Sequence, residues 1–318
     1  MSRYQSIFTM FSVAAILLIS AITATAAWEP KQPIQIIVGF APGGGTDATA
    51  RLIASASQEF FPVPLVVVNR PGASGTLAAE MVANSKPDGY TLLVAGGSES
   101  TSVPNHLKTN YKLSQFRGVI RVNREHMVIV TKADSGLDSI EKVVERAKAE
   151  PGSLIYGSSG PASILQSAFL VFEKEAGISM KHVPYKGGAP ALAALLGGHI
   201  DMTILTAPDA ATQMAAGKVY AIATTSDRAP QLPDVPSLSD LGYNINLENM
   251  KGLVVQSDTP DEIVNYLHDR FKKAMDSEAF TSLAKRANII PGYLNGADFE
   301  KAMKSMSDSI AAAIGNQQ

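Results

Sequence analysis

The chain has 318 residues, a formal net charge of −2 at pH 7 and no cysteine. Its length is enough for two domains of ordinary size, and its near-neutral charge gives no indication of nucleic-acid binding. The lack of cysteine excludes disulfides, thiolate metal sites, a cysteine nucleophile and a lipid anchor on an N-terminal cysteine.

The first 27 residues have the pattern of an export signal. Arg3 is a positive end, residues 7–19 form a mostly apolar core, and residues 24–27 offer small side chains for cleavage. The apolar core is too short to span a membrane comfortably as a helix. We therefore expect a soluble mature chain that begins at Ala27 or Trp28 and lies in the periplasm of a two-membrane bacterium.

The first unit after the signal is predicted to be a strand, a glycine turn and a helix. Residues 34–38 are apolar and rich in β-branched side chains, and residues 48–60 have apolar side chains at helical spacing. The turn between them contains three glycines, so a ligand can approach its backbone closely. Its free N–H groups at a helix start favour an anion, although a tight turn that binds nothing is the alternative. The turn residues expected at a ligand are Phe40, Ala41, Gly43, Gly44, Thr46 and Asp47.

Two further predicted strands, at 64–68 and 91–95, are also followed by glycines. A loop at 69–75 follows the first strand, and Ser98 closes the loop after the second. This alternation indicates parallel βαβ units, in which ligands lie outside the carboxyl ends of the strands.

The same pattern restarts in the middle of the chain. Residues 119–122 and 127–130 are predicted strands that lead out of the first domain. The later predicted strands are 154–156, 182–184, 200–205 and 219–224, and they alternate with predicted helices at 139–149 and 162–174 and with helices that end at 196 and 216. Residues 252–255 then form a strand that crosses back, followed by helices at about 260–276, 278–286 and 295–314.

A second glycine loop, at residues 185–190, has the same design as the first. It follows an apolar strand, contains Gly187 and Gly188, and leads through Ala189 into an alanine-rich helix. Two facing helix N-termini would form a clamp for one small anion. For Lys186, a solvated surface charge is as good an interpretation as a ligand contact.

Five segments resemble signatures of the Bug, or tripartite tricarboxylate transporter, extracytoplasmic solute receptors (TctC-like). They occur in the family's order and span nearly the whole mature chain. The segments are residues 34–47 together with 50–52, residues 68–75, residues 86–93, residues 183–192 and residues 232–238.

The resemblance implies an α/β, two-domain periplasmic binding protein fold (type II-like) with the ligand cleft between the domains. It also implies a small carboxylate ligand, a di- or tricarboxylate or an aromatic acid, held by backbone groups and water and delivered to small and large membrane permease subunits. The chain departs from the family at Leu205 and Thr206, where members often carry a polar or acidic residue and an asparagine. This departure argues against an amino-acid ligand that needs a carboxylate for its ammonium group.

Two enzyme-like alternatives are weaker. The first glycine loop fits a loose dinucleotide pattern, but Asn69 stands where the acidic ribose contact is expected. Ser158 and Ser159 lie on a strand-to-helix turn as in an exported hydrolase, but the G-x-S-x-G elbow is absent from the sequence. The histidines form no i, i+4 pair for a metal. We therefore expect no enzyme activity, no cofactor and no metal.

We expect residues 28–127 and 253–318 to form domain 1 and residues 128–252 to form domain 2, with two connections as a hinge. A monomer is expected, with a carboxylate and the permease as partners and no nucleic acid. Arg124 is a further candidate for selectivity. The expected ligand-binding set is Phe40, Ala41, Gly43, Gly44, Thr46, Asp47, Ser98, Ser158, Ser159, Gly187, Gly188, Ala189 and Thr206.

Overall fold

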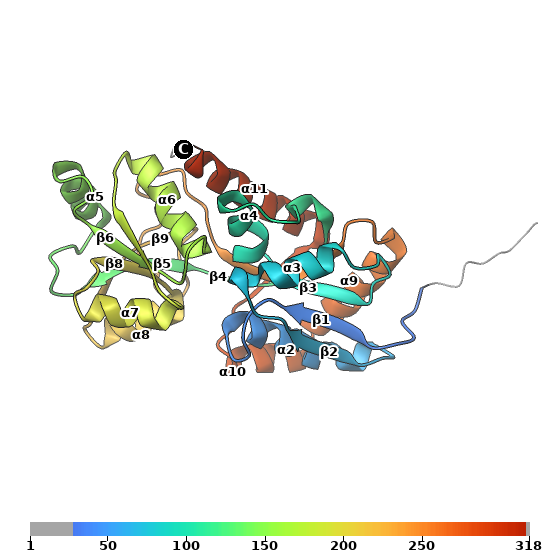
Figure 1. Ribbon diagram of the computed structural model, residues 1–318. Helices are drawn as coiled ribbons and strands as arrows, with labels where there is room; N and C mark the ends of the chain where they lie inside the picture. The colour runs from blue at the N-terminus through green and yellow to red at the C-terminus, as the bar shows by residue number, and fades with distance from the viewer. Residues whose placement is uncertain (1–27, 316–318) are drawn as a thin grey trace, which may run out of the picture.

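The computed structural model describes residues 28–315 and shows two α/β halves side by side (Figure 1). The predicted export signal, residues 1–27, and residues 316–318 lie outside the described residues. Each half contains one sheet, and the chain passes between the halves twice, at His126 and between Leu247 and Asn249.

The first half has a six-stranded sheet in the order β11-β4-β10-β3-β1-β2. The strands β1, β2 and β3 are parallel, whereas β10 runs antiparallel to both β3 and β4. Its strands are β1 (Ile34–Val38), β2 (Leu65–Asn69), β3 (Thr91–Ala95), β4 (Phe116–Glu125), β10 (Asn249–Gln256) and β11 (Pro291–Asn295), and its main helices are α2 (Gly45–Ser57), α3 (Thr76–Ala83), α9 (Asp261–Met275), α10 (Glu278–Arg286) and α11 (Gly296–Ile314).

The second half has a five-stranded sheet in the order β7-β6-β8-β5-β9. The strands β6, β7 and β8 are parallel, whereas β5 runs antiparallel to β8 and β9. Its strands are β5 (Met127–Lys132), β6 (Ile155–Ser158), β7 (Lys181–Pro184), β8 (Met202–Thr206) and β9 (Val219–Thr224), and its helices are α5 (Ile140–Ala149), α6 (Ile164–Ala176), α7 (Gly188–Leu196) and α8 (Ala207–Ala215).

The predicted parallel strands are present in both sheets, as β1, β2 and β3 and as β6, β7 and β8. The crossing strands β4, β5 and β10 run antiparallel to their neighbours. Two details differ from the sequence prediction. The return strand begins at Asn249 rather than at Gly252, and strand β11 was not predicted at all. The polar residues Asn249 and Lys251 hide the start of β10, since an apolar run is the main sequence signal of a buried strand.

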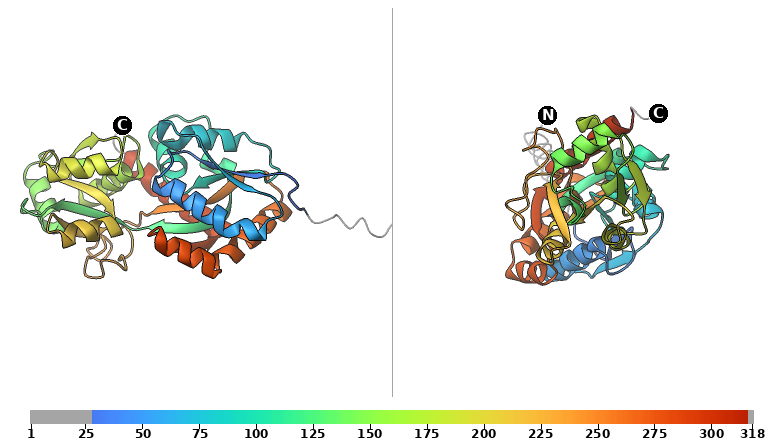
Figure 2. Two further views of the ribbon diagram at one scale, coloured as in Figure 1. Left: turned by 90° about the horizontal axis from the view of Figure 1, so that it is seen from below. Right: turned by 90° about the vertical axis from the view of Figure 1, so that its left-hand side faces the viewer.

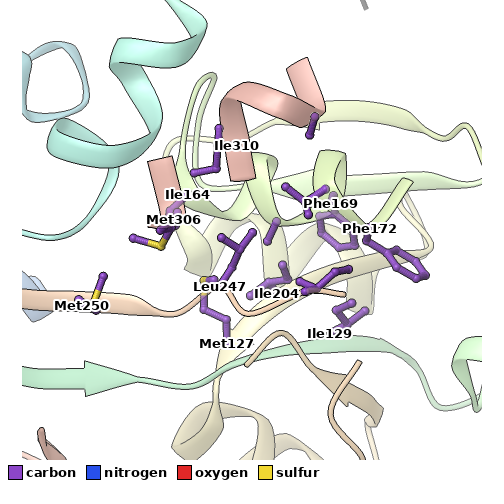
Figure 3. Packing of buried hydrophobic residues seen from close by; sticks show 14 of the residues in the cluster. Met127, Ile129, Ile164, Phe169, Phe172, Ile204, Leu247, Met250, Met306 and Ile310 are labelled. Carbon is purple, nitrogen blue, oxygen red and sulfur yellow. The ribbon is translucent and has the colours of Figure 1, made fainter. Parts of the chain in front are cut away.

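The two halves share one apolar core on the side of α6 and α11. Met127, Ile164 and Phe169 of the second half belong to the same buried cluster as Met306 and Ile310 of α11 (Figure 3). The red C-terminal end of the chain accordingly lies beside the green and yellow half (Figure 2). Because this side is packed with side chains, a ligand has to enter the space between the halves elsewhere.

Candidate functional site

The first glycine loop is held by a buried carboxylate. Asp47 accepts hydrogen bonds from Gly43 N–H (2.9 Å), Arg51 Nε (2.9 Å) and Asn69 Nδ2 (2.8 Å). Burial by itself would raise the pKa of Asp47, but these hydrogen bonds outweigh it and lower the pKa to about 2. The side chain of Asp47 therefore fixes the shape of the loop, and the backbone is the part left to meet a ligand.

The start of α2 offers backbone donors. Gly44 precedes the helix in an extended conformation, and the first intrahelical bond runs from Ala48 N–H to Gly44 O (2.9 Å). The N–H groups of Gly45, Thr46 and Asp47 come before that bond, as at every helix start. They lie at the positive end of the helix dipole, where an anion is stabilised.

The second glycine loop is built on the ends of β6 and β7. Gly187 has φ of 117°, a left-handed conformation that favours glycine, and α7 begins at Gly188. Gly187 N–H donates to Ser159 O (3.1 Å), which ties this loop to the one after β6. Ser158 is completely buried, and its hydroxyl contacts Gly160 O (2.8 Å) and His182 Nε2 (2.7 Å).

Two adjoining cavities lie between the halves. They have volumes of about 140 and 360 Å³, and they share Thr46, Asn249 and Lys251. The first is lined by Phe40, Thr46, Val94, Ala95, Gly97, Ser98, Glu99, Ser159, Ile164, Leu165, Asn249, Met250 and Lys251. The second is lined by Gly45, Thr46, Ala48, Glu125, His126, Thr206, Pro208, Asp209, Asn249, Lys251, Ala287, Asn288, Ile289 and Ile290.

Only part of the expected ligand-binding set lines these cavities. Phe40, Thr46, Ser98 and Ser159 line the first, and Thr206 lines the second with Thr46. Within residues 28–315, the linings of these two cavities do not include Ala41, Gly43, Gly44, Asp47, Ser158, Gly187, Gly188 or Ala189.

Two of the lining hydroxyls already have partners. Ser98 Oγ accepts from Ile164 N–H (3.1 Å), which joins the loop after β3 to the start of α6 in the other half. Thr206 caps α8, because its hydroxyl donates to Asp209 Oδ2 (2.7 Å) and accepts from Asp209 N–H (3.4 Å). These two side chains therefore order the cleft as well as face it.

The sequence reasoning missed several polar residues of the cleft, among them Glu99, Glu125, Asn249 and Lys251. Lys251 Nζ lies 2.5 Å from Glu125 Oε1, and Asn249 Nδ2 donates to Glu125 Oε2 (2.8 Å). Glu99 and Lys251 are 2% and 4% exposed. In the sequence, Glu99 follows the glycines after a predicted buried strand, and Lys251 stands directly before the apolar predicted return strand. Charged residues are almost never buried without a partner, so both positions required one.

Arg124 lies at the end of β4, beside the first chain crossing, rather than in either cavity lining. It forms ion pairs with Glu248 (Nε to Oε2, 2.5 Å) and with Asp227, which belongs to the second half. Arg121 Nη1 also contacts Glu248 Oε1 (2.6 Å). Burial, helped by the charge of Arg124, lowers the pKa of the neighbouring His126. The two chain crossings are thus held together by charged side chains.

The comparisons with known proteins agree with this arrangement. The model of the tripartite tricarboxylate transporter family receptor (TctC) matches residues 49–316. The chain belongs to this receptor family. Protein BugT of Bordetella pertussis is 32% identical to the receptor over 255 residues, which cover 79% of this chain and 78% of BugT.

Solved structures of similar proteins show the same fold. A TctC solute-binding protein from Polaromonas matches with a TM-score of 0.79 and 30% identity, covering 90% of this receptor and 99% of that chain. Rpa4515 of R. palustris, solved with adipate, matches with a TM-score of 0.73 and 27% identity, covering 90% and 98%. The expected fold, α/β with two domains as in periplasmic binding proteins, is confirmed.

Proposed function

We propose that this receptor captures a small carboxylate in the cleft between its two halves and delivers it to the small and large membrane permease subunits of a tripartite tricarboxylate-type transporter. Residues 1–27 would act as an export signal, and the mature protein would work in the periplasm as a monomer. The hinge would be at the two chain crossings, close to the boundaries expected at 127/128 and 252/253.

The observation that carries the proposal is the position of the helix starts around the cleft. Thr46 at the start of α2 lines both cavities, and Thr206 at the start of α8 lines the second. Ser159 and Ile164, at the loop and helix after β6, line the first. Several helix N-termini directed at one space favour an anion without a basic side chain. The adipate in the similar protein Rpa4515 is such an anion.

The receptor role includes no catalysis. Ser158 and His182 are within hydrogen-bond distance, as in a nucleophile and base pair, but Ser158 is completely buried and its hydroxyl also contacts Gly160 O. Asn69, at the position of the ribose contact in a dinucleotide site, donates to Phe40 O (3.0 Å) and to Asp47. Both residues therefore hold the loops in place.

The proposal is tested by thermal shift with purified mature protein and a panel of mono-, di- and tricarboxylates, aromatic acids, sugars and simple cations. A ligand that binds only the folded protein raises the melting temperature, and the stabilisation grows with the logarithm of its concentration over Kd. We expect carboxylates to raise it and to be recovered chemically unchanged. The proposal is wrong if only sugars or cations stabilise the protein, or if the carboxylate is converted.

No helix among residues 28–315 is long and apolar enough to cross a membrane. Periplasmic extraction followed by mass spectrometry tests the export signal: a mass that begins at Ala27 or Trp28 supports it. Recovery of chains that retain Met1, or recovery only with membranes, would contradict it.

A further inference from the structure

Glu99 holds a free carboxylate oxygen at the wall of the first cavity. It lies in the π-helical turn η3 (Ser98–Ser102) directly after β3, and it is 2% exposed. Gly97 N–H (3.2 Å) and the Ser100 hydroxyl (3.0 Å) both donate to Oε1. Among the residues that the structure describes, no hydrogen bond reaches Oε2. One oxygen therefore positions the carboxyl group, and the other is available to a ligand.

A second hydrogen-bond acceptor, Asn249 Oδ1, lies close to Gly97 as Glu99 Oε2 does, so both are within reach of the same ligand atom. Asn249 Nδ2 donates to Glu125 Oε2, which fixes the orientation of the amide. A Cβ atom placed on Gly97 would lie 3.3 Å from Glu99 Oε2 and 3.2 Å from Asn249 Oδ1. The missing side chain of Gly97 thus leaves a space between two acceptor oxygens. A hydrogen-bond donor fits that space, whereas a second carboxylate would face two acceptors.

The linings of the two cavities together contain one lysine, Lys251, and three acids, Glu99, Glu125 and Asp209. Lys251 is paired with Glu125 at 2.5 Å, so Glu99 shares no counter-ion at that distance within residues 28–315. Burial raises the pKa of Glu99, although hydrogen bonds from Gly97 and Ser100 and the charge of Lys251 act in the other direction. A buried carboxyl group in this position is stabilised most by a cation.

We infer that Glu99 is the specificity-determining residue of this receptor and that the cleft takes a small amino carboxylate. The protonated nitrogen of the ligand lies between Glu99 Oε2 and Asn249 Oδ1, and its carboxylate lies at the helix start of Thr46. This inference rests on the proposed function and narrows its ligand class. It reverses the sequence-based argument against an amino-acid ligand, which was drawn from Leu205 and Thr206 alone.

Matched probes test the inference by calorimetric titration: butyrate, 2-aminobutyrate, 4-aminobutyrate and succinate. We expect one of the two amino acids to bind at least about tenfold more tightly than butyrate and succinate, since a hydrogen bond to a charged group is worth about that factor or more. The comparison isolates the nitrogen, because the carbon chain is the same in all four probes.

Two variants and one control variant test whether the preference for amino acids arises at Glu99 and Asn249. Glu99→Gln keeps the shape but removes the charge, and we expect it to lose about tenfold in amino-acid affinity while butyrate stays within about twofold. Gly97→Ala puts a methyl group between the two acceptors and should cause the same selective loss. Glu59→Gln, at an exposed acid of the first half, should change neither affinity. Circular dichroism and the melting temperature show whether each variant is folded.

The outcomes separate this inference from the proposed function. If succinate bound as tightly as the better amino acid, or if Glu99→Gln kept full amino-acid affinity, the inference would be wrong and the receptor function would stand. If none of these probes and no other carboxylate bound, both would be wrong. Should Glu99→Gln not fold, the Gly97→Ala variant decides, because φ of −108° at Gly97 lies outside the left-handed region that favours glycine. A folded Gly97→Ala variant that still prefers amino acids would overturn the inference.

Discussion

The two walls of the cleft use different chemistry. The first half contributes the buried charges Glu99 and Lys251 and the half-buried Glu125. The second half contributes Ser159 and Thr206, with helix starts behind them, and no buried charge lines either cavity from that side within residues 28–315. Backbone N–H groups and hydroxyls bind any carboxylate, whereas a buried charge accepts or rejects the rest of the molecule. We therefore expect the wall from the first half to determine which carboxylate binds, whereas both walls contribute to the affinity.

The largest expected effect comes from blocking the glycine loops. Gly44→Val and Gly188→Val place branched side chains in the loops where the sequence predicts ligand contacts, although neither glycine lines the two cavities. If the halves close so that the ligand meets these loops, each variant should reduce affinity by more than about 100-fold, the loss of a few charge-assisted hydrogen bonds. Both variants should fold. A Cβ at Gly44 meets only Ala41 O at 3.8 Å, and at Gly188 it meets nothing within 4 Å.

Calorimetric titration with the best carboxylate measures this loss, with circular dichroism as the folding control. Normal binding by both folded valine variants would mean that the loops are plain turns and that the site lies at the charged wall alone. A loss in only one variant would show which half supplies the backbone contacts.

The halves also differ in the direction in which the pKa of a buried acid outside the two cavity linings is shifted. Glu173 on α6 is 6% exposed, and it accepts a hydrogen bond from Met180 N–H (2.5 Å). Burial raises the pKa of Glu173 to about 7, with the Met180 bond acting in the other direction. The unfolded chain loses this proton near pH 4.5 and the folded chain keeps it up to about 7, so stability falls as pH rises across that window.

The Glu173→Gln variant has no carboxyl group to deprotonate, so it should not lose stability as pH rises across this window. We expect the variant to gain on the wild type as pH rises from 4.5 to 7, by about 2–3 kcal/mol in the free energy of unfolding, because each unit of pKa shift corresponds to about 1.4 kcal/mol. Urea unfolding at several pH values measures it. A difference between the two proteins that stays constant with pH would show that Glu173 does not titrate in this range.

Asp47 in the first half should behave in the opposite way. Its pKa is lowered, so its contribution to stability is present above pH 3.8 and is lost as pH falls through about 2. Asp47→Asn should therefore cost about 1–2 kcal/mol near neutral pH, the lower value allowing for screening at the exposed Arg51 end of the pair. The difference between variant and wild type in urea unfolding should shrink toward pH 2; a difference that grew there would contradict the ion-pair account.

The sequence predicted the positions of helices and strands better than it predicted which residues line the cleft. Glycine loops mark strand ends locally, so β1 and β3 lie where they were expected, at residues 34–38 and 91–95. The partnership of Glu99 and Asn249 depends on β10 returning beside β3, a pairing between segments about 150 residues apart that no local pattern contains. That return is also why the basis for the proposed amino-acid preference could not be found from Leu205 and Thr206.

The smallest expected effect tests whether the second wall uses charge. Lys186 is exposed in the second glycine loop, so its attraction for a ligand anion is screened by water and salt. Lys186→Ala should change the affinity for the best carboxylate by no more than about twofold in 0.15 M salt. Lys148→Ala, at an exposed lysine of α5 in the same half, is the matched control. If Lys186→Ala lost about tenfold in affinity and Lys148→Ala lost none, charge in the second half would also contribute to recognition. The proposed division, in which only the first half selects the ligand by charge, would then be wrong.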